Sequence, residues 1–486
     1  MLDLHTMMAT IGRAGMWLGP AAGVFFWWLG LEWELPVAGR VTWGLMGWMA
    51  VWWLTEAVPL AVTALLPLVV LPLGGAMTLS SAASPFASSI IFLFAGGFVL
   101  ALAIQHVGLD TRLAMAVLSK AGRTGPGIVA AFMLATAALS AFISNTATAA
   151  MMLPLALSVL AVTDTHQPWP QAARKAFGRC LLLGIAYGAT IGGVATIIGS
   201  PPNALAAEFM REELGIDVSF VGWMLLVAPL SVLLLPIGWF LLTRVLQPVN
   251  GLDLPVDFAR SLAAGRDGGW TKAQRRVAAI FIVTAAAWLC RPFIQDAVPA
   301  AKALGDSGIA VCAAIACFIV PGGDGRGPIL DIGSVRRLPW EILILFGGGL
   351  SLAAGVEQTG VADAIAGTLS GLPAMPAVVV IAIVAGAILL LTELTSNTAT
   401  AATFIPVLAA GAAVLGVQPT DLVMAAAAAA SCAFMLPVAT PPNAIAFSAG
   451  RLEVADMARC GIWLNVVALL LIAALARWLW PWLLAT

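Results

Sequence analysis

The amino-acid sequence predicts an all-α integral membrane protein with about eleven transmembrane helices and two re-entrant hairpins, arranged as two inverted-topology repeats. The first observation is composition: 61% of the 486 residues are hydrophobic and 10% are charged, whereas soluble domains carry about 25% charged residues. The second is that apolar stretches recur along the whole chain, and the third is an internal repeat. We therefore expect the membrane region to be the protein itself, with no soluble domain attached.

The composition also argues against several classes of protein. A net charge of −1 disfavours nucleic acid as a partner. The six cysteines lie mostly in apolar segments and form no CxxC, which indicates packing residues, not a disulfide framework or a metal site. The three histidines show no metal-ligand or nucleophile–base spacing. We therefore expect neither an enzyme nor an organic cofactor.

Eleven apolar segments are predicted to cross the membrane. They lie near residues 16–31, 41–57, 58–77, 90–108, 180–210, 219–246, 277–293, 307–320, 341–357, 421–447 and 462–482. The first of these lacks the small-residue cleavage pattern of a signal peptide, so we expect it to be retained as a helix.

Two further apolar regions, 127–160 and 377–415, are each interrupted at the centre by Ser-Asn-Thr. Polar residues at this depth must be buried in protein or face a water-filled cavity. We therefore expect an inner re-entrant hairpin at 127–160 and an outer one at 377–415. With the N-terminus in the cytoplasm and the C-terminus outside, 18 of the 23 Lys and Arg fall in cytoplasmic segments. This is the distribution that the positive-inside rule requires of a multi-pass protein in the plasma membrane, the inner membrane in a bacterium.

The internal repeat is the strongest signal in the chain. The segment Ile143–Pro154 matches Thr395–Pro406 at eight of twelve positions, and the same offset aligns Leu93–Gly97 with Leu345–Gly349. Further along, Gly199-Ser-Pro-Pro-Asn-Ala204 matches Ala439-Thr-Pro-Pro-Asn-Ala444. Three ordered matches indicate a duplicated unit.

The repeat divides the chain into parts. We expect an N-terminal segment with the first helix at 1–40, repeat 1 at 41–246, a cytoplasmic linker at 247–276 and repeat 2 at 277–486. Each repeat would hold five crossings and a hairpin, and an odd number of crossings requires the second repeat to be inverted. The Pro-Pro pairs at 201–202 and 441–442 would break the helices at 180–210 and 421–447. Inverted repeats with broken helices are typical of secondary transporters, whose sites lie near the bilayer midplane.

The interrupting triplets have the chemistry of a helix N-terminus. Ser, Asn and Thr cap helices and the following Ala-rich sequence propagates them, and such an end attracts anions. Asn145, Asn397 and the hydroxyls of Thr146 and Thr398 add donors, while the Asn oxygens can face a cation. No Lys or Arg lies within 139–160, 189–207, 389–414 or 430–449. An unpaired dianion there would be very costly, so co-bound cations and ion-coupled symport are favoured over exchange.

Three other polar residues have weaker interpretations. Glu393 is an intramembrane carboxylate that could relay protons, tune a cation site or lie at a polar surface of the hairpin. Glu56 and His106 lie near predicted helix ends, where structural or interfacial roles are expected.

The paired Ser-Asn-Thr-Ala-Thr motifs, the two Pro-Pro-Asn breaks and Trp-Leu-Thr-Glu-Ala-Val-Pro at 53–59 resemble the divalent anion/sodium symporter family, that of the INDY-type dicarboxylate transporters. The resemblance runs from about residue 41 to the end. It implies a homodimer in membrane lipid that carries a C4-dicarboxylate such as succinate with sodium, by an elevator mechanism.

The resemblance also implies the site residues. Substrate contacts would come from Asn145, Thr146, Ser200, Pro201, Asn397, Thr398, Thr440 and Pro441. One sodium would be held around Ser140, Ser144, Asn145 and Gly199, and a second around Thr392, Thr395, Asn397 and Ala439. Thr395 stands where family members frequently have Ala, which the site tolerates if the ligand there is a backbone carbonyl.

Two alternatives remain open at this point. Some members of the family are exchangers without sodium coupling, so a sodium-independent exchanger of dicarboxylates, tartrate or sulfate is the second hypothesis. A channel or an intramembrane enzyme is a third, but a channel needs a continuous polar pathway and an enzyme needs a nucleophile or metal cluster. The sequence shows neither.

Overall fold

The computed structural model describes residues 4–166, 169–252, 269–297, 305–323, 327–369 and 375–484. This part of the chain is built from helices and contains no β-strand. Seven of its helices are long and apolar enough to cross a membrane, and five shorter apolar helices accompany them. The predicted all-α membrane class is therefore confirmed. Much of the predicted linker at 247–276, with Arg260 and Arg266, lies outside the described residues.

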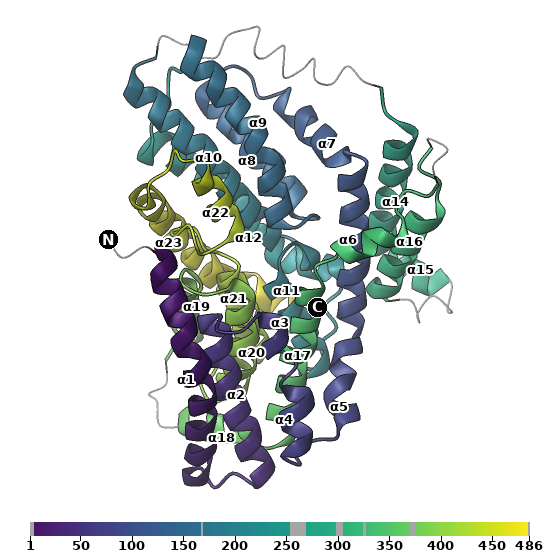
Figure 1. The fold of residues 1–486 in the computed structure, drawn as a ribbon, viewed down its shortest axis with the longest axis vertical. Helices are drawn as coiled ribbons and strands as arrows, with labels where there is room; N and C mark the ends of the chain where they lie inside the picture. Colours follow the sequence, from purple (N-terminus) through teal and green to yellow (C-terminus); the bar gives the residue numbers. More distant parts are fainter. Residues whose placement is uncertain are drawn as a thin grey trace.

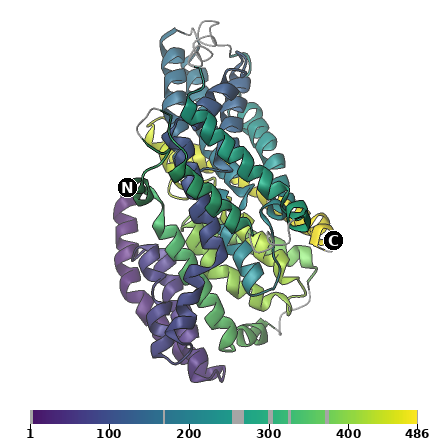
Figure 2. The same cartoon turned by 90° about the vertical axis from the view of Figure 1, so that its right-hand side faces the viewer.

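The helices at residues 4–32, 37–55 and 67–73 lie toward one end of the elongated molecule, whereas the helix at residues 109–118 lies toward the other end, beside the first hairpin (Figures 1 and 2). The N-terminal helices are α1 (Leu4–Glu32), α2 (Val37–Thr55), α3 (Leu60–Thr63), α4 (Pro67–Leu73), α6 (Ser89–His106) and α7 (Leu109–Leu118). The crossing predicted at 58–77 is two short helices, α3 and α4, separated at residues 64–66. Pro67 at the start of α4 lacks the N–H that a continuous helix would use.

Two helical hairpins and two broken helices form the centre. The first hairpin is α8 (Gly125–Ser140) and α9 (Asn145–His166), followed by α10 (Gln171–Val194), α11 (Pro201–Glu212) and α12 (Phe220–Phe240). The second hairpin is α19 (Ala377–Thr392) and α20 (Asn397–Ala412), followed by α21 (Pro419–Ala430), α22 (Pro441–Ser448) and α23 (Val454–Trp478). The chain leaves α-helical geometry at residues 195–200 and 431–440, just before each Pro-Pro pair.

The remaining long helices flank this centre. They are α14 (Lys272–Leu289), α16 (Asp306–Ile319) and α17 (Trp340–Gln358). Helix α16 packs along α6 and against α14, and α17 contacts α2, α4 and α6. In Figure 1, α14 and α16 form a separate column beside α6.

The two halves interlock at the centre of the molecule. Helix α11 of the first half packs on α20 and α21 of the second, and α22 of the second half packs on α9 and α10 of the first. The C-terminal piece of each broken helix therefore lies against the hairpin of the other half. This exchange brings both hairpin tips and both helix breaks into one region.

Small residues allow the close packing of α8 against α10. Gly184, Gly188 and Gly192 recur every fourth residue and so share one face of α10. A Cβ at Gly188 would collide with the Met133 backbone, and one at Gly192 with the Ala137 backbone. Small residues at this spacing let helices approach closely in lipid, where apolar burial provides little driving force. The contact fixes the end of α10 beside the tip of the first hairpin.

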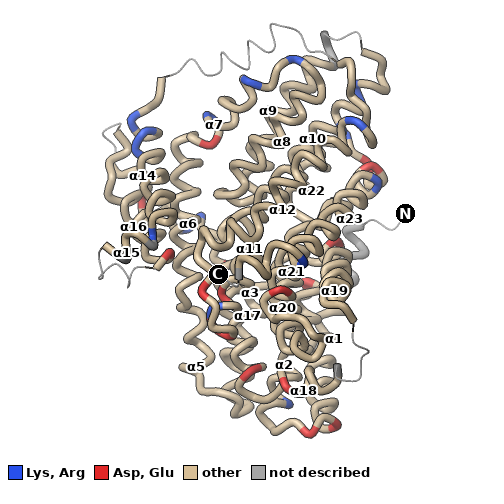
Figure 3. Tube along the Cα trace, turned by 180° about the vertical axis from the view of Figure 1, so that it is seen from behind, with Lys and Arg blue, Asp and Glu red and all other residues tan. Residues whose placement is uncertain are grey.

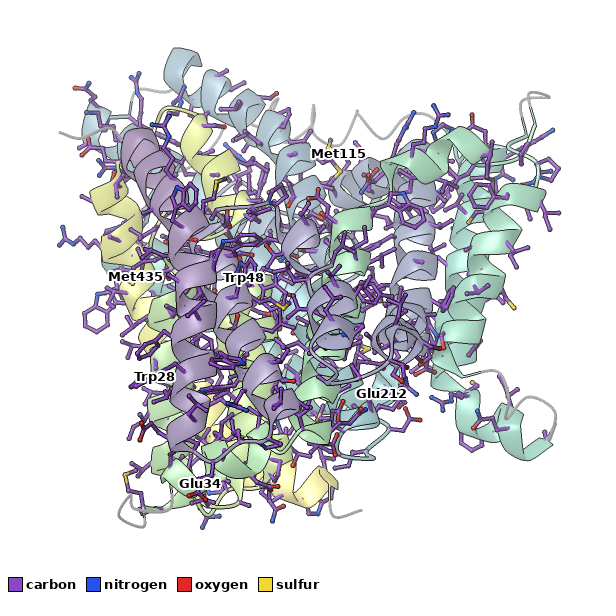
Figure 4. All side chains as sticks on the ribbon, turned by 60° about the horizontal axis from the view of Figure 1, so that its bottom comes forward. Trp28, Glu34, Trp48, Met115, Glu212 and Met435 are labelled. Atoms are coloured by element: carbon purple, nitrogen blue, oxygen red, sulfur yellow. The ribbon has the colours of Figure 1, made fainter. Side chains whose placement is uncertain are left out.

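The surface reflects a bilayer environment. Trp28 on α1 is 52% exposed, whereas Trp48 on α2 packs against Gly19 and Gly23 of α1; both are labelled in Figure 4. Lys and Arg gather at the end that holds α7 and the starts of α10 and α14 (Figure 3). Several Asp and Glu lie at the opposite end, beside α2 and α18 (Val361–Leu369). The apolar flanks thus separate two polar ends of different charge.

Candidate functional site

The tip of the first hairpin is ordered by hydroxyl groups. Helix α8 ends at Ser140 and α9 begins at Asn145, and the N–H of Ala147 donates to Ser144 Oγ at 3.3 Å, which caps α9. Ser140 Oγ lies 2.5 Å from the Asn145 amide and donates to the Ala189 carbonyl of α10 at 2.7 Å. With its nitrogen turned toward α10, the same amide donates to the Gly199 carbonyl at 3.2 Å. The tip is therefore bonded to α10 and to the break that follows it.

The tip of the second hairpin repeats this network. Ser396 Oγ accepts from the N–H of Ala399, which caps α20. Thr392 Oγ1 donates to Asn397 Oδ1 at 2.7 Å and to the Ala430 carbonyl, the last of α21, at 3.0 Å. Thr392 occupies the position that aligns with Ser140 in the sequence repeat. A hydroxyl side chain thus positions the asparagine at both tips.

Asparagines also hold the two helix breaks. Asn203 Nδ2 donates to the carbonyls of Gly193 (3.1 Å), Val194 (3.1 Å) and Thr196 (2.8 Å). Asn443 Nδ2 donates to the carbonyls of Ala433 (3.3 Å) and Leu436 (2.9 Å). Both asparagines are fully buried. Carbonyls freed where each helix ends are therefore satisfied by the Asn of the Pro-Pro-Asn motif, as buried backbone groups require.

A cavity of about 550 Å³ lies where the tips and breaks meet. The lining comes from both Ser-Asn-Thr triplets, both helix breaks and three flanking helices: Glu56, Phe94, Phe98, Ser144, Asn145, Thr146, Ile198, Gly199, Ser200, Pro201, Ile342, Ser396, Asn397, Thr398, Val438, Ala439, Thr440, Pro441, Pro442 and Ala444. No Lys or Arg is among these lining residues. The volume suits a small molecule.

Four helix N-termini point their first residues at this cavity. Asn145, Pro201, Asn397 and Pro441 begin α9, α11, α20 and α22, and all four line it. Each helix N-terminus carries a partial positive charge of about half an electron and unsatisfied N–H groups suited to an anion. The electropositive character of the site therefore comes from the backbone.

The predicted site residues fall into two groups, those that line the cavity and those that are buried behind the lining asparagines. All eight predicted substrate contacts line the cavity, as do the predicted cation ligands Ser144, Gly199 and Ala439. Ser140 and Thr392 are completely buried behind the asparagines they bond. Their roles as ligands stay predictions.

Thr395 differs from the other predicted ligands. Its hydroxyl donates to the Leu391 carbonyl at 2.9 Å and lies 2.8 Å from Thr400 Oγ1. The side chain is thus occupied within the hairpin, and its backbone carbonyl is the group that could serve a cation.

Several lining residues were missed by sequence reasoning. Glu56, at the end of α2, is the only charged residue among those that line the cavity, and it adopts a left-handed backbone conformation with φ of 48°. Phe94 lines the cavity and contacts Phe346 edge-to-face at 5.1 Å. Both phenylalanines belong to the repeated Leu-Phe-x-Gly-Gly motif, which was the available signal. Ser431 does not line the cavity, but its hydroxyl oxygen lies 2.9 Å from that of the lining residue Ser200, and no such signal marked it in the sequence.

Comparisons with known proteins agree with this architecture. The model of a family described as the sodium:sulfate symporter transmembrane region matches residues 21–486. The sodium-dependent dicarboxylate transporter SdcS of Staphylococcus aureus (strain USA300) is 36% identical over 453 residues, which cover 92% of this chain and 87% of that protein. The SdcS of the bovine strain RF122 / ET3-1 is 35% identical over 453 residues, which again cover 92% of this chain and 87% of that protein.

Among solved structures, the YdaH transporter of Alcanivorax borkumensis, described as having an unusual topology, is similar with a TM-score of 0.54 and 16% identity. The match covers 83% of this chain and 88% of that one, and at this identity it supports the fold alone. The sequence relatives and the family model carry the assignment. The chain is a multi-pass membrane protein, not an enzyme, and it belongs to the divalent anion/sodium symporter family.

Proposed function

We propose that this protein is a sodium-coupled symporter of a small dicarboxylate, a C4 acid such as succinate. The observation that carries the proposal is the convergence of four helix N-termini and two asparagines on one cavity. Among the residues that the structure describes, no basic side chain lines this cavity. Backbone N–H groups and the Asn and Thr side chains suit two carboxylates. The name of the SdcS relatives supports the substrate class.

The charge balance supports coupling to sodium. Each helix N-terminus contributes a partial positive charge of about half an electron, and the Glu56 carboxylate partly offsets this positive charge. A dianion taken out of water there needs further positive charge. Two sets of oxygen donors lie beside the cavity, one around Asn145 and Gly199 and one around Asn397 and Ala439. Unwound carbonyls and helix ends of this kind hold sodium in secondary transporters.

We propose that transport follows an elevator mechanism within a homodimer. The hairpins and broken helices are tied together by Ser140–Ala189, Thr392–Ala430 and Ser200–Ser431 hydrogen bonds. Such a unit would move as one body against a frame that includes α2, α6 and α14. The repeated hydrogen bonds at the two tips support a duplicated unit, whose two copies we propose to be inverted relative to each other.

The distribution of charge supports the orientation of the chain. The end rich in Lys and Arg in Figure 3 would face the cytoplasm, because positive residues are retained on that side. The N-terminus would then be cytoplasmic and the C-terminus outside.

Uptake into proteoliposomes tests the proposal. The purified protein should accumulate labelled succinate when an inward sodium gradient is imposed, and should not when choline replaces sodium. Equal uptake into succinate-loaded vesicles without sodium would select the exchanger instead. A panel of competing acids, including tartrate and sulfate, would then identify the preferred anion.

A further inference from the structure

Glu393 is a buried carboxylate at the tip of the second hairpin. It directly follows Thr392, the last residue of α19, and is 3% exposed. It does not line the cavity described above. Its partners show what it does there.

Four donor groups converge on the Glu393 carboxylate. The N–H of Phe434 lies 2.8 Å from Oε1, that of Met435 lies 3.0 Å from each oxygen, and that of Leu436 lies 3.1 Å from Oε2. Asn465 Nδ2 on α23 donates to Oε1 at 2.7 Å. Three successive backbone N–H groups directed at one anion form a nest, which neutralises charge without a basic side chain.

These donors belong to the break between α21 and α22. Residues 431–440 leave helical geometry, and their N–H groups need partners at membrane depth. Glu393 satisfies three of these N–H groups, while Asn443 satisfies carbonyls of the same segment. Helix α23 packs directly against the same segment at Gly461. A Cβ at this position would collide with the backbone of Phe434 and Met435.

The first half holds its break differently. Ala141 stands at the position that aligns with Glu393 and has no side-chain acceptor to offer. In the first half, a side chain of the break bonds the backbone of the tip. Thr196 Oγ1 donates to the Ala141 carbonyl and accepts from the Gly199 N–H. A short 3-10 turn at Ile197–Gly199 completes the connection. The side chain that joins the break to the hairpin tip therefore belongs to the break in the first half, as Thr196, and to the tip in the second half, as Glu393.

We propose that Glu393 is a positioning residue that, with Gly461 and Asn465 of α23, fixes the backbone of residues 431–440. This segment carries Ala439, which lines the cavity and belongs to the proposed second cation site, so the anchor would determine the geometry of that site. The two cation sites then differ in what supports them. The transport consequence rests on the proposed sodium-coupled function, whereas the anchor itself does not.

A native cysteine reports directly on this anchor. Cys432 lies within the segment and is fully buried, and Cys180 on α10 is equally buried in the first half. The full-length protein would be alkylated with N-ethylmaleimide and each site quantified by mass spectrometry. Glu393→Ala should raise the rate at which Cys432 is alkylated by about tenfold or more. In the wild type, local opening of the segment must break hydrogen bonds to the Glu393 carboxylate, and in the variant these bonds are absent. Cys180 should react as in the wild type.

Graded variants separate an anchor from general loosening. Glu393→Gln keeps one acceptor oxygen and should lie between wild type and Glu393→Ala, and Asn465→Ala, which removes one donor, should raise Cys432 reactivity modestly. Unchanged Cys432 reactivity in Glu393→Ala would overturn the proposal. The proposal would also be overturned if Glu393→Ala raised the alkylation rates of Cys180 and Cys432 equally while Glu393→Gln and Asn465→Ala left both rates at the wild-type value. If those variants exposed Cys432 selectively, the anchor would stand.

Sodium activation of succinate uptake tests the functional consequence. Glu393→Ala should raise the sodium concentration for half-maximal uptake several-fold, with a smaller change in maximal rate, and Glu393→Gln should partly restore it. Glu208→Gln is the matched control, since Glu208 is a carboxylate 1% exposed that pairs with Arg211 away from the segment. Unaltered sodium dependence in Glu393→Ala would refute the effect on the cation site. Absence of sodium-driven uptake in the wild type would refute the proposed function, and Cys432 labelling would still decide the anchor.

Discussion

Asn145 and Asn397, which begin the second helices of the two hairpins, line the same cavity from opposite halves of the chain. Each is bonded to a hydroxyl at the end of the preceding helix, Ser140 in one case and Thr392 in the other. The two asparagines are therefore equivalent in position and in support.

Replacing either asparagine should weaken both ligands. Asn145→Ala and Asn397→Ala each remove an amide whose oxygen can face a cation and whose nitrogen can face a carboxylate. We expect sodium and succinate affinities to fall together in both variants, measured by equilibrium binding to purified protein. Unchanged sodium affinity in both would contradict the shared role.

The hydroxyls behind the asparagines should matter through orientation. Ser140→Ala removes the bonds to Asn145 and to the Ala189 carbonyl, a loss of about 1–3 kcal/mol for a buried group left without its partner. We expect a raised half-saturating sodium concentration and a lower melting temperature. Ser158→Ala is the control, because Ser158 bonds the Pro154 carbonyl on the exposed face of α9. Equal effects of the two substitutions would show that the buried bond has no special role.

A single methyl group at Gly193 should disturb the first site. A Cβ there would collide with the side-chain amide of Asn145, whereas a Cβ at Gly367 on α18 meets no atom within 4 Å. Gly193→Ala should therefore reduce uptake strongly while Gly367→Ala transports like the wild type. Full activity of Gly193→Ala would mean that Asn145 need not occupy this position during transport.

Two aspartates that share Arg291 should differ in their contribution to stability. Asp306 is 10% exposed at its side chain and also accepts from the N–H of Phe220 at 2.7 Å, while Asp217 is 60% exposed. Breaking a buried pair costs about 3 kcal/mol or more, and an exposed pair contributes at most about 1 kcal/mol. Thermal unfolding in detergent should therefore show a clear loss for Asp306→Ala and little for Asp217→Ala. Similar losses would contradict this ranking.

Local patterns were sufficient to predict much of the architecture. The duplicated Ser-Asn-Thr and Pro-Pro-Asn segments predicted both tips and both breaks, because capping residues and proline act on the adjacent backbone. Hydroxyl residues at 140 and 392 followed from the family resemblance. The break between α3 and α4 was missed because an apolar run does not distinguish one helix from two.

Contacts between distant segments could not be read from the sequence. Glu393 gave no indication that its partners are the N–H groups of Phe434 to Leu436, since backbone donors leave no mark in side-chain patterns. Glu56 lies at a helix end as expected, yet it faces the cavity because α2 packs near the second hairpin. The exchange of α11 and α22 between the halves likewise depends on tertiary packing alone.

Binding of labelled succinate to the purified protein, with sodium or with choline at equal ionic strength, tests the central claim most directly. Backbone helix ends converge on a cavity that no lysine or arginine lines in the described part of the chain. This predicts tight binding in sodium and a loss of at least about tenfold, or 1.4 kcal/mol, in choline. Equal affinity in both salts would contradict the account, because the cavity would then hold a dianion without co-bound cations.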